Sequence, residues 1–100
     1  MRDQLKQLLL SRAISEARNM GYSFSSQTES DLRELISDAV DSMSYSQYLS
    51  PVDNLRALNN TDILIRRVAE NARSRQIGDR LDQKSLADVR GTICPLWPFC

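Results

Sequence analysis

Residues 28–43, TESDLRELISDAVDSM, carry the clearest helical pattern in the chain. Apolar side chains recur there at spacings of three and four residues, which places them on one face of an amphipathic helix. They are Leu32, Leu35, Ile36, Ala39, Val40 and Met43. Thr28, followed three residues later by Asp31, resembles a capping box, so the sequence predicts a helix over residues 28–43.

The segment before this helix repeats the same periodicity. Its apolar stripe predicts a first helix over residues 2–20. The members of the stripe are Leu5, Leu8, Leu9, Ala13, Ala17 and Met20. Gly21 follows directly, and glycine readily adopts the left-handed conformation that ends a helix.

Two further helices are predicted after residue 43. Ser50 is a good N-cap, and Pro51 suits the first position of a helix, so a short helix is expected over residues 51–58. Two asparagines then interrupt the pattern. Thr61 is expected to cap a fourth helix, over residues 61–77, because apolar side chains recur through that segment.

No alternating strand pattern is present, so the expected fold is all-α: a small bundle of three to four short helices with an irregular C-terminal tail. We divide the chain into a helical leader or carrier domain over residues 1–78, a linker over 79–90 and a core peptide over 91–100. The linker has only scattered apolar residues. The prolines at 95 and 98 disfavour helix and strand in the tail.

Composition excludes several classes of function. The 100 residues carry 13 basic and 13 acidic side chains, interleaved, so nucleic acid is a poor partner. The short run of leucines at 8–10 predicts neither a signal peptide nor a membrane span, and we expect a cytoplasmic precursor. There is no histidine and no phosphate-binding glycine loop, so we expect no enzyme, catalytic residue or cofactor.

Reactive residue types gather in the last ten residues, GTICPLWPFC. Both cysteines, Cys94 and Cys100, lie in this uncharged segment. A thiolate is a strong nucleophile and a ligand for soft metals. Trp97 and Phe99 offer aromatic carbons for crosslinking, and Thr92 offers a hydroxyl for dehydration. The two cysteines alone could close a disulfide ring or, as a weaker alternative, bind a metal such as Cu(I).

This layout resembles the precursor of a ribosomally synthesised and post-translationally modified peptide. Residues 17–25, ARNMGYSFS, are also similar to the leader type associated with nitrogen fixation. The resemblance implies that a modifying enzyme, oxidative or thioether-forming, binds the leader, with or without a separate leader-binding protein. It also implies modification at Cys100 and Cys94. Cys100 is favoured because it carries a C-terminal carboxylate beside its thiol.

The same resemblance implies that a processing protease cleaves near Arg90 and Gly91. A small bioactive or metal-binding peptide, open to export, would then be released.

Two other interpretations of the tail stay open at this point. The chain could be a small helical interaction protein whose apolar tail docks into a groove of a partner, with Trp97 and Phe99 as anchors. Alternatively, the tail could fold back on its own helices, and the cysteines would then serve as small apolar residues.

Overall fold

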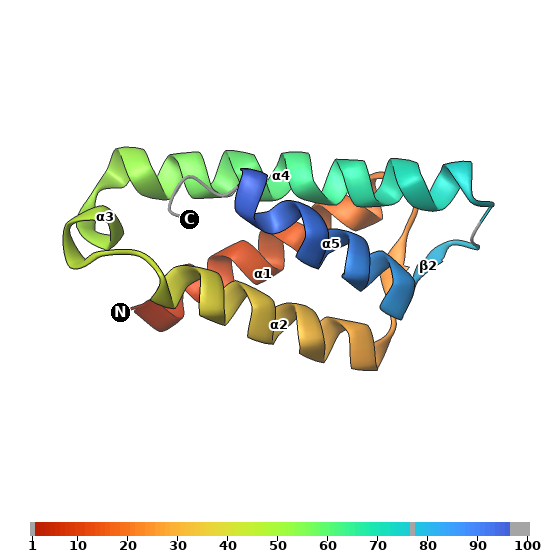
Figure 1. The fold of residues 1–100 in the computed structure, drawn as a ribbon, viewed down its shortest axis with the longest axis horizontal. Helices are drawn as coiled ribbons and strands as arrows, with labels where there is room; N and C mark the ends of the chain where they lie inside the picture. The colour runs from red at the N-terminus through yellow and green to blue at the C-terminus, as the bar shows by residue number, and fades with distance from the viewer. Residues whose placement is uncertain (1, 77, 97–100) are drawn as a thin grey trace.

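The computed structural model describes residues 2–76 and 78–96, with side chains described through residue 91. The elements in chain order are α1 (Arg2–Asn19), β1 (Ser23–Phe24), α2 (Ser26–Asp41), α3 (Tyr45–Leu49), α4 (Pro51–Ser74), β2 (Arg80–Leu81) and α5 (Gln83–Leu96). Helices dominate the described chain, which confirms the predicted small all-α fold. Figure 1 shows an elongated bundle with α3 at one end and the strands at the other.

Four helices build the bundle. α1 packs against α2 and α4, and α5 packs against the same two helices, so α1 and α5 occupy opposite corners. α5 is shorter than α4 and accompanies only the part of α4 nearer the strands (Figure 1). α3 is a short helix that packs on α4 and turns the chain between α2 and α4.

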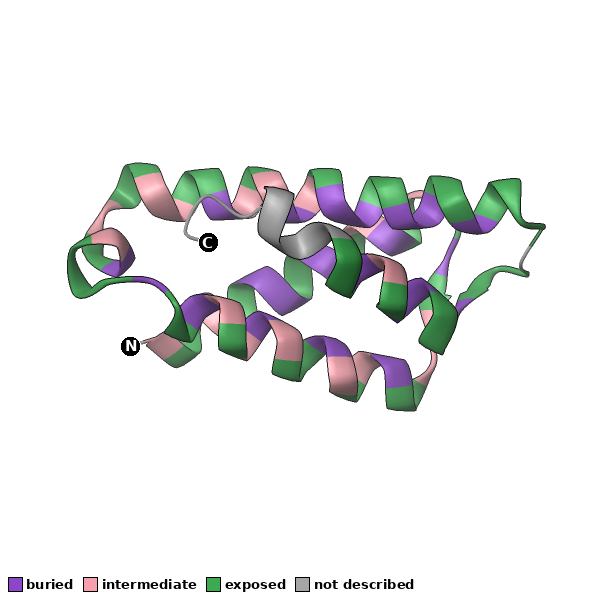
Figure 2. Ribbon diagram, viewed as in Figure 1, coloured by how far each residue is buried: buried purple, intermediate pink, exposed green. Residues whose placement is uncertain are grey.

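The hydrophobic core runs along the inside of this arrangement, where the buried faces of the helices meet (Figure 2). Every helix contributes to it, and the short strand β2 contributes Leu81. The side chains most completely buried are Leu9, Leu32, Ile65, Leu81, Leu86, Val40, Val68, Val89, Thr28 and Ser85. One continuous core therefore extends from α1 to α5.

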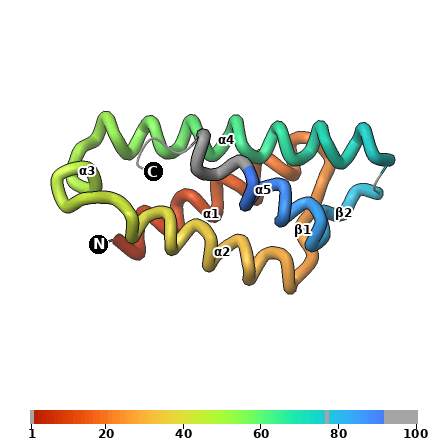
Figure 3. Tube along the Cα trace, in the orientation of Figure 1, coloured from red at the N-terminus to blue at the C-terminus, as the bar shows by residue number. Residues whose placement is uncertain are grey.

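The two strands form a parallel pair at the end of the bundle opposite α3 (Figure 3). Ser23 aligns with Arg80, and Phe24 aligns with Leu81. The backbone N–H of Ser23 donates to the carbonyl of Asp79 at 2.9 Å. Two residues are too short to show an alternating pattern, which explains why the sequence gave no signal for the pair.

Gly21 lies between α1 and β1 with φ 85°, in the left-handed region. This confirms the predicted end of the first helix, which stops at Asn19. The second helix is also confirmed, but its predicted cap is wrong. The side chain of Ser25, not that of Thr28, caps α2: its Oγ accepts the backbone N–H of Thr28 at 3.2 Å. Thr28 is instead a buried residue of the first turn.

The predicted break at residues 59–60 is wrong, because α4 is continuous from Pro51 to Ser74. The predicted cap Ser50 and the predicted first residue Pro51 are confirmed. Thr61 caps nothing; it is buried within the helix, and its hydroxyl donates to the carbonyl of Ala57 at 2.8 Å. The burial of Ala57, Thr61 and Leu64 on the inner face of α4 thus outweighs the weak helix propensity of Asn59 and Asn60.

The prediction of a linker over residues 79–90 is also wrong. The carboxylate of Asp82 accepts the backbone N–H of Lys84 at 3.1 Å and that of Ser85 at 3.2 Å, which caps α5. Leu86 and Val89, three residues apart, are each 0% exposed. The segment therefore belongs to the bundle, and residue 78 is no structural boundary.

The tail also differs from the expected irregular conformation. α5 continues as helix through Leu96 and includes Pro95, although a proline in a helix removes one backbone hydrogen bond. The buried anchors earlier in α5 fix its direction, so the chain enters residues 91–96 already helical. Residues 97–100 lie outside the described residues.

Candidate functional site

The predicted cleavage region lies on α5, just beyond its last buried anchor. Arg90 and Gly91 directly follow Val89, and both are exposed. A protease usually binds its substrate in an extended conformation, whereas this bond lies within a helix. Cleavage at this position therefore requires local opening of the carboxyl end of α5.

Of the other predicted site residues, Thr92 and Cys94 belong to the helical backbone of α5. Trp97, Phe99 and Cys100 lie outside the described residues. The structure thus brings part of the predicted site together on one helix and leaves the Cys94 and Cys100 pair, as modification sites or as weak metal ligands, a prediction.

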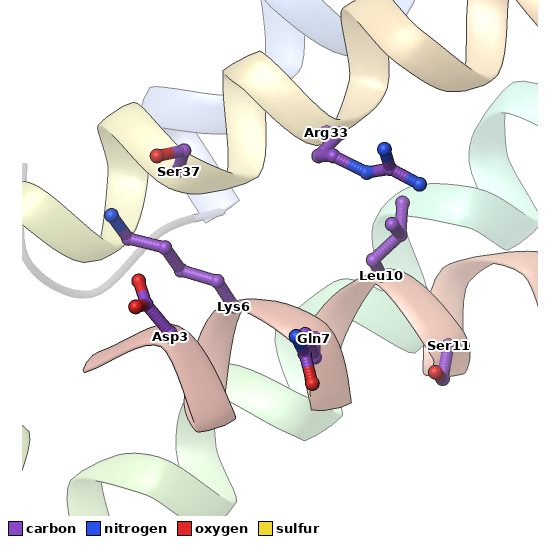
Figure 4. A pocket seen from close by; sticks show the side chains of 7 residues that line it. All are labelled: Asp3, Lys6, Gln7, Leu10, Ser11, Arg33 and Ser37. Atoms are coloured by element: carbon purple, nitrogen blue, oxygen red, sulfur yellow. The ribbon is translucent and has the colours of Figure 1, made fainter. Parts of the chain in front are cut away.

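A groove runs along the surface between α1 and α2 (Figure 4). Its volume is about 660 Å³, and its lining residues are Asp3, Lys6, Gln7, Leu10, Ser11, Arg33 and Ser37. Figure 4 shows Arg33 and Ser37 on α2 facing a row of side chains on α1. Leu10 is the buried apolar residue of this lining, so the groove has a polar wall on each side.

The charges in this groove are unevenly distributed. The Nζ of Lys6 lies 3.0 Å from the carboxylate of Asp41, so its charge is already balanced. Within the described ranges, neither Asp3 nor Arg33 forms an ion pair. The carboxylate of Asp3 and the guanidinium of Arg33 lie at opposite ends of the groove (Figure 4), and Lys6 lies at the same end as Asp3.

A second surface feature is apolar and lies near α3. Its exposed large side chains and their exposed fractions are Leu8 51%, Tyr45 69%, Leu49 50%, Val52 67% and Leu55 59%. Leu8 and Leu49 also line a smaller hollow of about 340 Å³ between α1 and the start of α4. We call these five side chains the α3 surface. A contiguous patch of exposed apolar groups is typical of a site of protein contact, and of these five side chains Leu8 and Leu49 share one hollow.

The polar atoms at the rim of this hollow are not all paired. The Nδ2 of Asn54 donates to the carbonyl of Tyr48 at 3.1 Å. The Oδ1 of Asn54 is buried and has no hydrogen-bond partner among the described residues. Asn54 is thus held through its Nδ2, and its Oδ1 is closed off from solvent.

Ion pairs join α1 to α4 on another face. Arg12 binds Asp62 through two nitrogens, with the shortest distance 2.9 Å, and the Nε of Arg66 lies 2.6 Å from the carboxylate of Glu16. The hydrogen bond to Asp62, and then its charge, raise the pKa of Arg12. The corresponding contact with Glu16 raises the pKa of Arg66. These guanidinium groups stay charged at every physiological pH, so the pairs hold the helices together rather than take part in proton transfer.

The described part of the chain, with its gaps at residue 77 and after residue 96, contains no group of three or more side chains suited to a metal ion. Within those ranges, no helix combines the length and apolar character that a membrane span requires.

Sequence reasoning missed both surface features. The groove residues Asp3 and Arg33 are far apart in the chain, and only the packing of α1 on α2 brings them to one groove. Part of the α3 surface did leave a signal, because Val52 and Leu55 are apolar and three residues apart in the helix predicted over residues 51–58.

Comparison with known proteins found no match: no family model, no curated protein and no solved structure is similar to this chain.

Proposed function

We propose that this chain is the precursor of a ribosomally synthesised and post-translationally modified peptide. One observation carries the proposal. Every charged residue lies at or before Arg90, and the buried Val89 anchors that part of the chain in the bundle. Both cysteines, the single tryptophan and two of the three prolines lie beyond it. A charged, packed carrier thus precedes a short uncharged segment that concentrates the reactive groups.

In this proposal the bundle serves as the leader that a modifying enzyme binds. Binding the bundle holds the attached segment near the active site at a high effective concentration, so the segment itself needs little affinity. The enzyme, oxidative or thioether-forming, then modifies Cys94 and Cys100. Thr92, Trp97 and Phe99 are possible partners in a crosslink.

The residue types at the carboxyl end of α5 make this part of the helix easy to open for an enzyme. Gly91 has a low helix propensity, and a proline such as Pro95 removes a helical hydrogen bond. Opening the last turns of α5 therefore costs less than opening a helix of average composition. The same opening exposes the bond after Arg90 to a processing protease.

The proposed compartment is the cytoplasm, where two cysteines remain available as thiols until they are modified. The mature peptide would be released and exported. Neither nucleic acid nor a membrane is needed for these steps.

The experiment is to express the chain in its native host and compare product formation by Cys94→Ser and Cys100→Ser with wild type. We expect each substitution to abolish modification at its own position. Ser74→Ala, at the exposed end of α4, is the matched control and should leave product formation unchanged. Full product from the variant that lacks both cysteines would refute the proposal.

One observation favours a second function, that of an interaction protein. The helix of α5 runs through Leu96, so the start of the apolar tail is helical, and helices commonly dock in apolar grooves. In that case replacing both cysteines with serine spares binding to the partner, whereas Trp97→Ala abolishes it. The precursor proposal expects loss of product in the first variant.

A further inference from the structure

The side chains of the groove between α1 and α2 restrict the chemistry of a binding partner more than those of the α3 surface do. The five side chains of the α3 surface are apolar or aromatic, so they do not by themselves distinguish one apolar partner from another. The groove, in contrast, presents the carboxylate of Asp3 at one end and the guanidinium of Arg33 at the other. Among the residues that the structure describes, neither of these two groups forms an ion pair, whereas Lys6 is paired with Asp41.

The side chains between these ends fit an extended backbone. Gln7, Ser11 and Ser37 provide amide and hydroxyl groups along the groove. An extended peptide has backbone N–H and C=O groups that need such partners, whereas a helix satisfies its own. A docking helix would instead need a row of apolar side chains, and the groove offers only Leu10.

The spacing of the two charged ends sets the spacing of the groups that match them. Arg33 extends over Leu10 in Figure 4, and Leu10 is seven residues beyond Asp3 on α1. At a rise of 1.5 Å per residue, this separation is about 10 Å. An extended chain advances about 3.3 Å per residue, and residues four apart lie on the same face about 13 Å apart. Their flexible side chains can span the difference.

We propose that this groove binds an extended segment of a partner protein that carries an acidic and a basic side chain four residues apart. The acidic side chain pairs with Arg33, and the basic side chain pairs with Asp3. This inference rests on the proposed function in one respect: the partner is the modifying enzyme or its leader-binding protein.

The first test is a titration of the isotopically labelled full chain with a synthetic peptide, followed by NMR. The probe is the capped peptide Lys-Thr-Ser-Thr-Glu. We expect amide shifts confined to residues 3–11 and 33–37. The peptide Lys-Thr-Ser-Thr-Lys, which lacks the acid, should bind more weakly. Shifts elsewhere, or equal binding of both peptides, would overturn the proposal.

Variants of the protein test the same contacts from the other side. Arg33→Glu should weaken binding of the probe by about two- to fivefold, the usual range for an exposed ion pair. Arg67→Glu makes the same change of charge at an exposed position on α4 and should bind the probe as wild type does. Equal binding by all three proteins would contradict a role for the groove. Circular dichroism of each variant reports whether the fold is intact.

The link to the proposed function has its own measurement. We expect Arg33→Glu to lower conversion of the fragment after Arg90 in the native host, whereas Arg67→Glu should not. If wild type and Arg33→Glu are converted equally, the groove is not the enzyme's binding site, and the proposed function stands. If wild type is not converted at all, the proposed function fails, and the peptide titration still decides whether the groove binds an extended segment.

Discussion

The two ends of the bundle differ in the large apolar side chains that they leave exposed, although both ends contribute to the core. At the strand end, Leu81 and Leu86 are each 0% exposed, and the parallel pair β1 and β2 closes the structure. At the α3 end, Val52 and Leu55 are 67% and 59% exposed, although they lie in the first turns of the longest helix.

The contrast distinguishes residues that stabilise the fold from residues that are available to contact a partner. Burying a leucine side chain contributes about 1.5–3 kcal/mol to folding, so the fully buried Leu81 and Leu86 both stabilise the strand end. Exposed apolar side chains contribute little to folding, so those at the α3 end are free to contact a partner. We interpret the strand end as the part that fixes α5 and the α3 end as a surface open to partners.

The largest expected effect comes from Leu86→Ala at the strand end. Truncating a fully buried leucine usually lowers the free energy of unfolding by about 2–5 kcal/mol. Chemical denaturation followed by circular dichroism measures the change. A loss below about 0.5 kcal/mol would show that α5 does not pack in the bundle, and it would remove the strand end as the stable region.

The two helix caps give a matched pair for the same comparison. Ser25→Ala removes the cap of α2 and the hydroxyl that donates to Thr28 at 2.7 Å, so we expect a loss of about 1–2 kcal/mol. Ser44→Ala removes half of the capping box of α3. Its effect should be smaller, because the five-residue α3 can open locally without unfolding the core.

Thermal unfolding of the two cap variants, measured side by side, gives the ranking. A larger loss from Ser44→Ala than from Ser25→Ala would reverse the assignment of the stable end.

The ion pairs between α1 and α4 lie between the two ends of the bundle. They should contribute less to stability than the cap of α2 does. Asp62→Asn removes the paired charge from Arg12, and we expect a smaller loss of stability than from Ser25→Ala, because Arg12 is exposed to solvent. The difference from wild type should shrink in high salt, because salt screens exposed charges. Unfolding curves at low and high salt provide the check, and a salt-independent loss would indicate packing rather than charge.

The smallest effect on stability is expected from Val52→Ser at the α3 end. We expect a change within about 0.5 kcal/mol, because the side chain is largely exposed. Binding of a hydrophobic dye should fall in this variant and not in Ser74→Ala. A large loss of stability would mean that Val52 belongs to the core, and the contrast between the ends would disappear.

The sequence predicts those parts of the fold that depend on neighbouring residues. Gly21 ends α1, and Ser50 with Pro51 begins α4, because each feature is set within one turn of helix. The choice of Ser25 over Thr28 as the cap of α2 was not predictable in this way. The chain at Ser25 is held extended by a hydrogen bond from its N–H to the carbonyl of Leu81, which is distant in sequence.

Dependence on distant residues also explains which further features the sequence did not predict. Leu86 and Val89 form a sparse pattern that predicts little alone, and only the space between α2 and α4 makes them anchors. The groove between Asp3 and Arg33 has no local signal for the same reason. Cys94 and Cys100 were predicted as modification sites from the reactivity of their thiols alone, and their modification remains a prediction.

The most direct test of the precursor proposal is mass spectrometry of the protein isolated from its native host, after reduction, alkylation and digestion with trypsin. Cleavage after Arg90 yields the fragment that begins at Gly91. We predict a mass change that localises to Cys94 or Cys100 and persists after reduction. A fragment of unaltered mass, with both thiols fully alkylated while the neighbouring genes are expressed, would contradict the proposal.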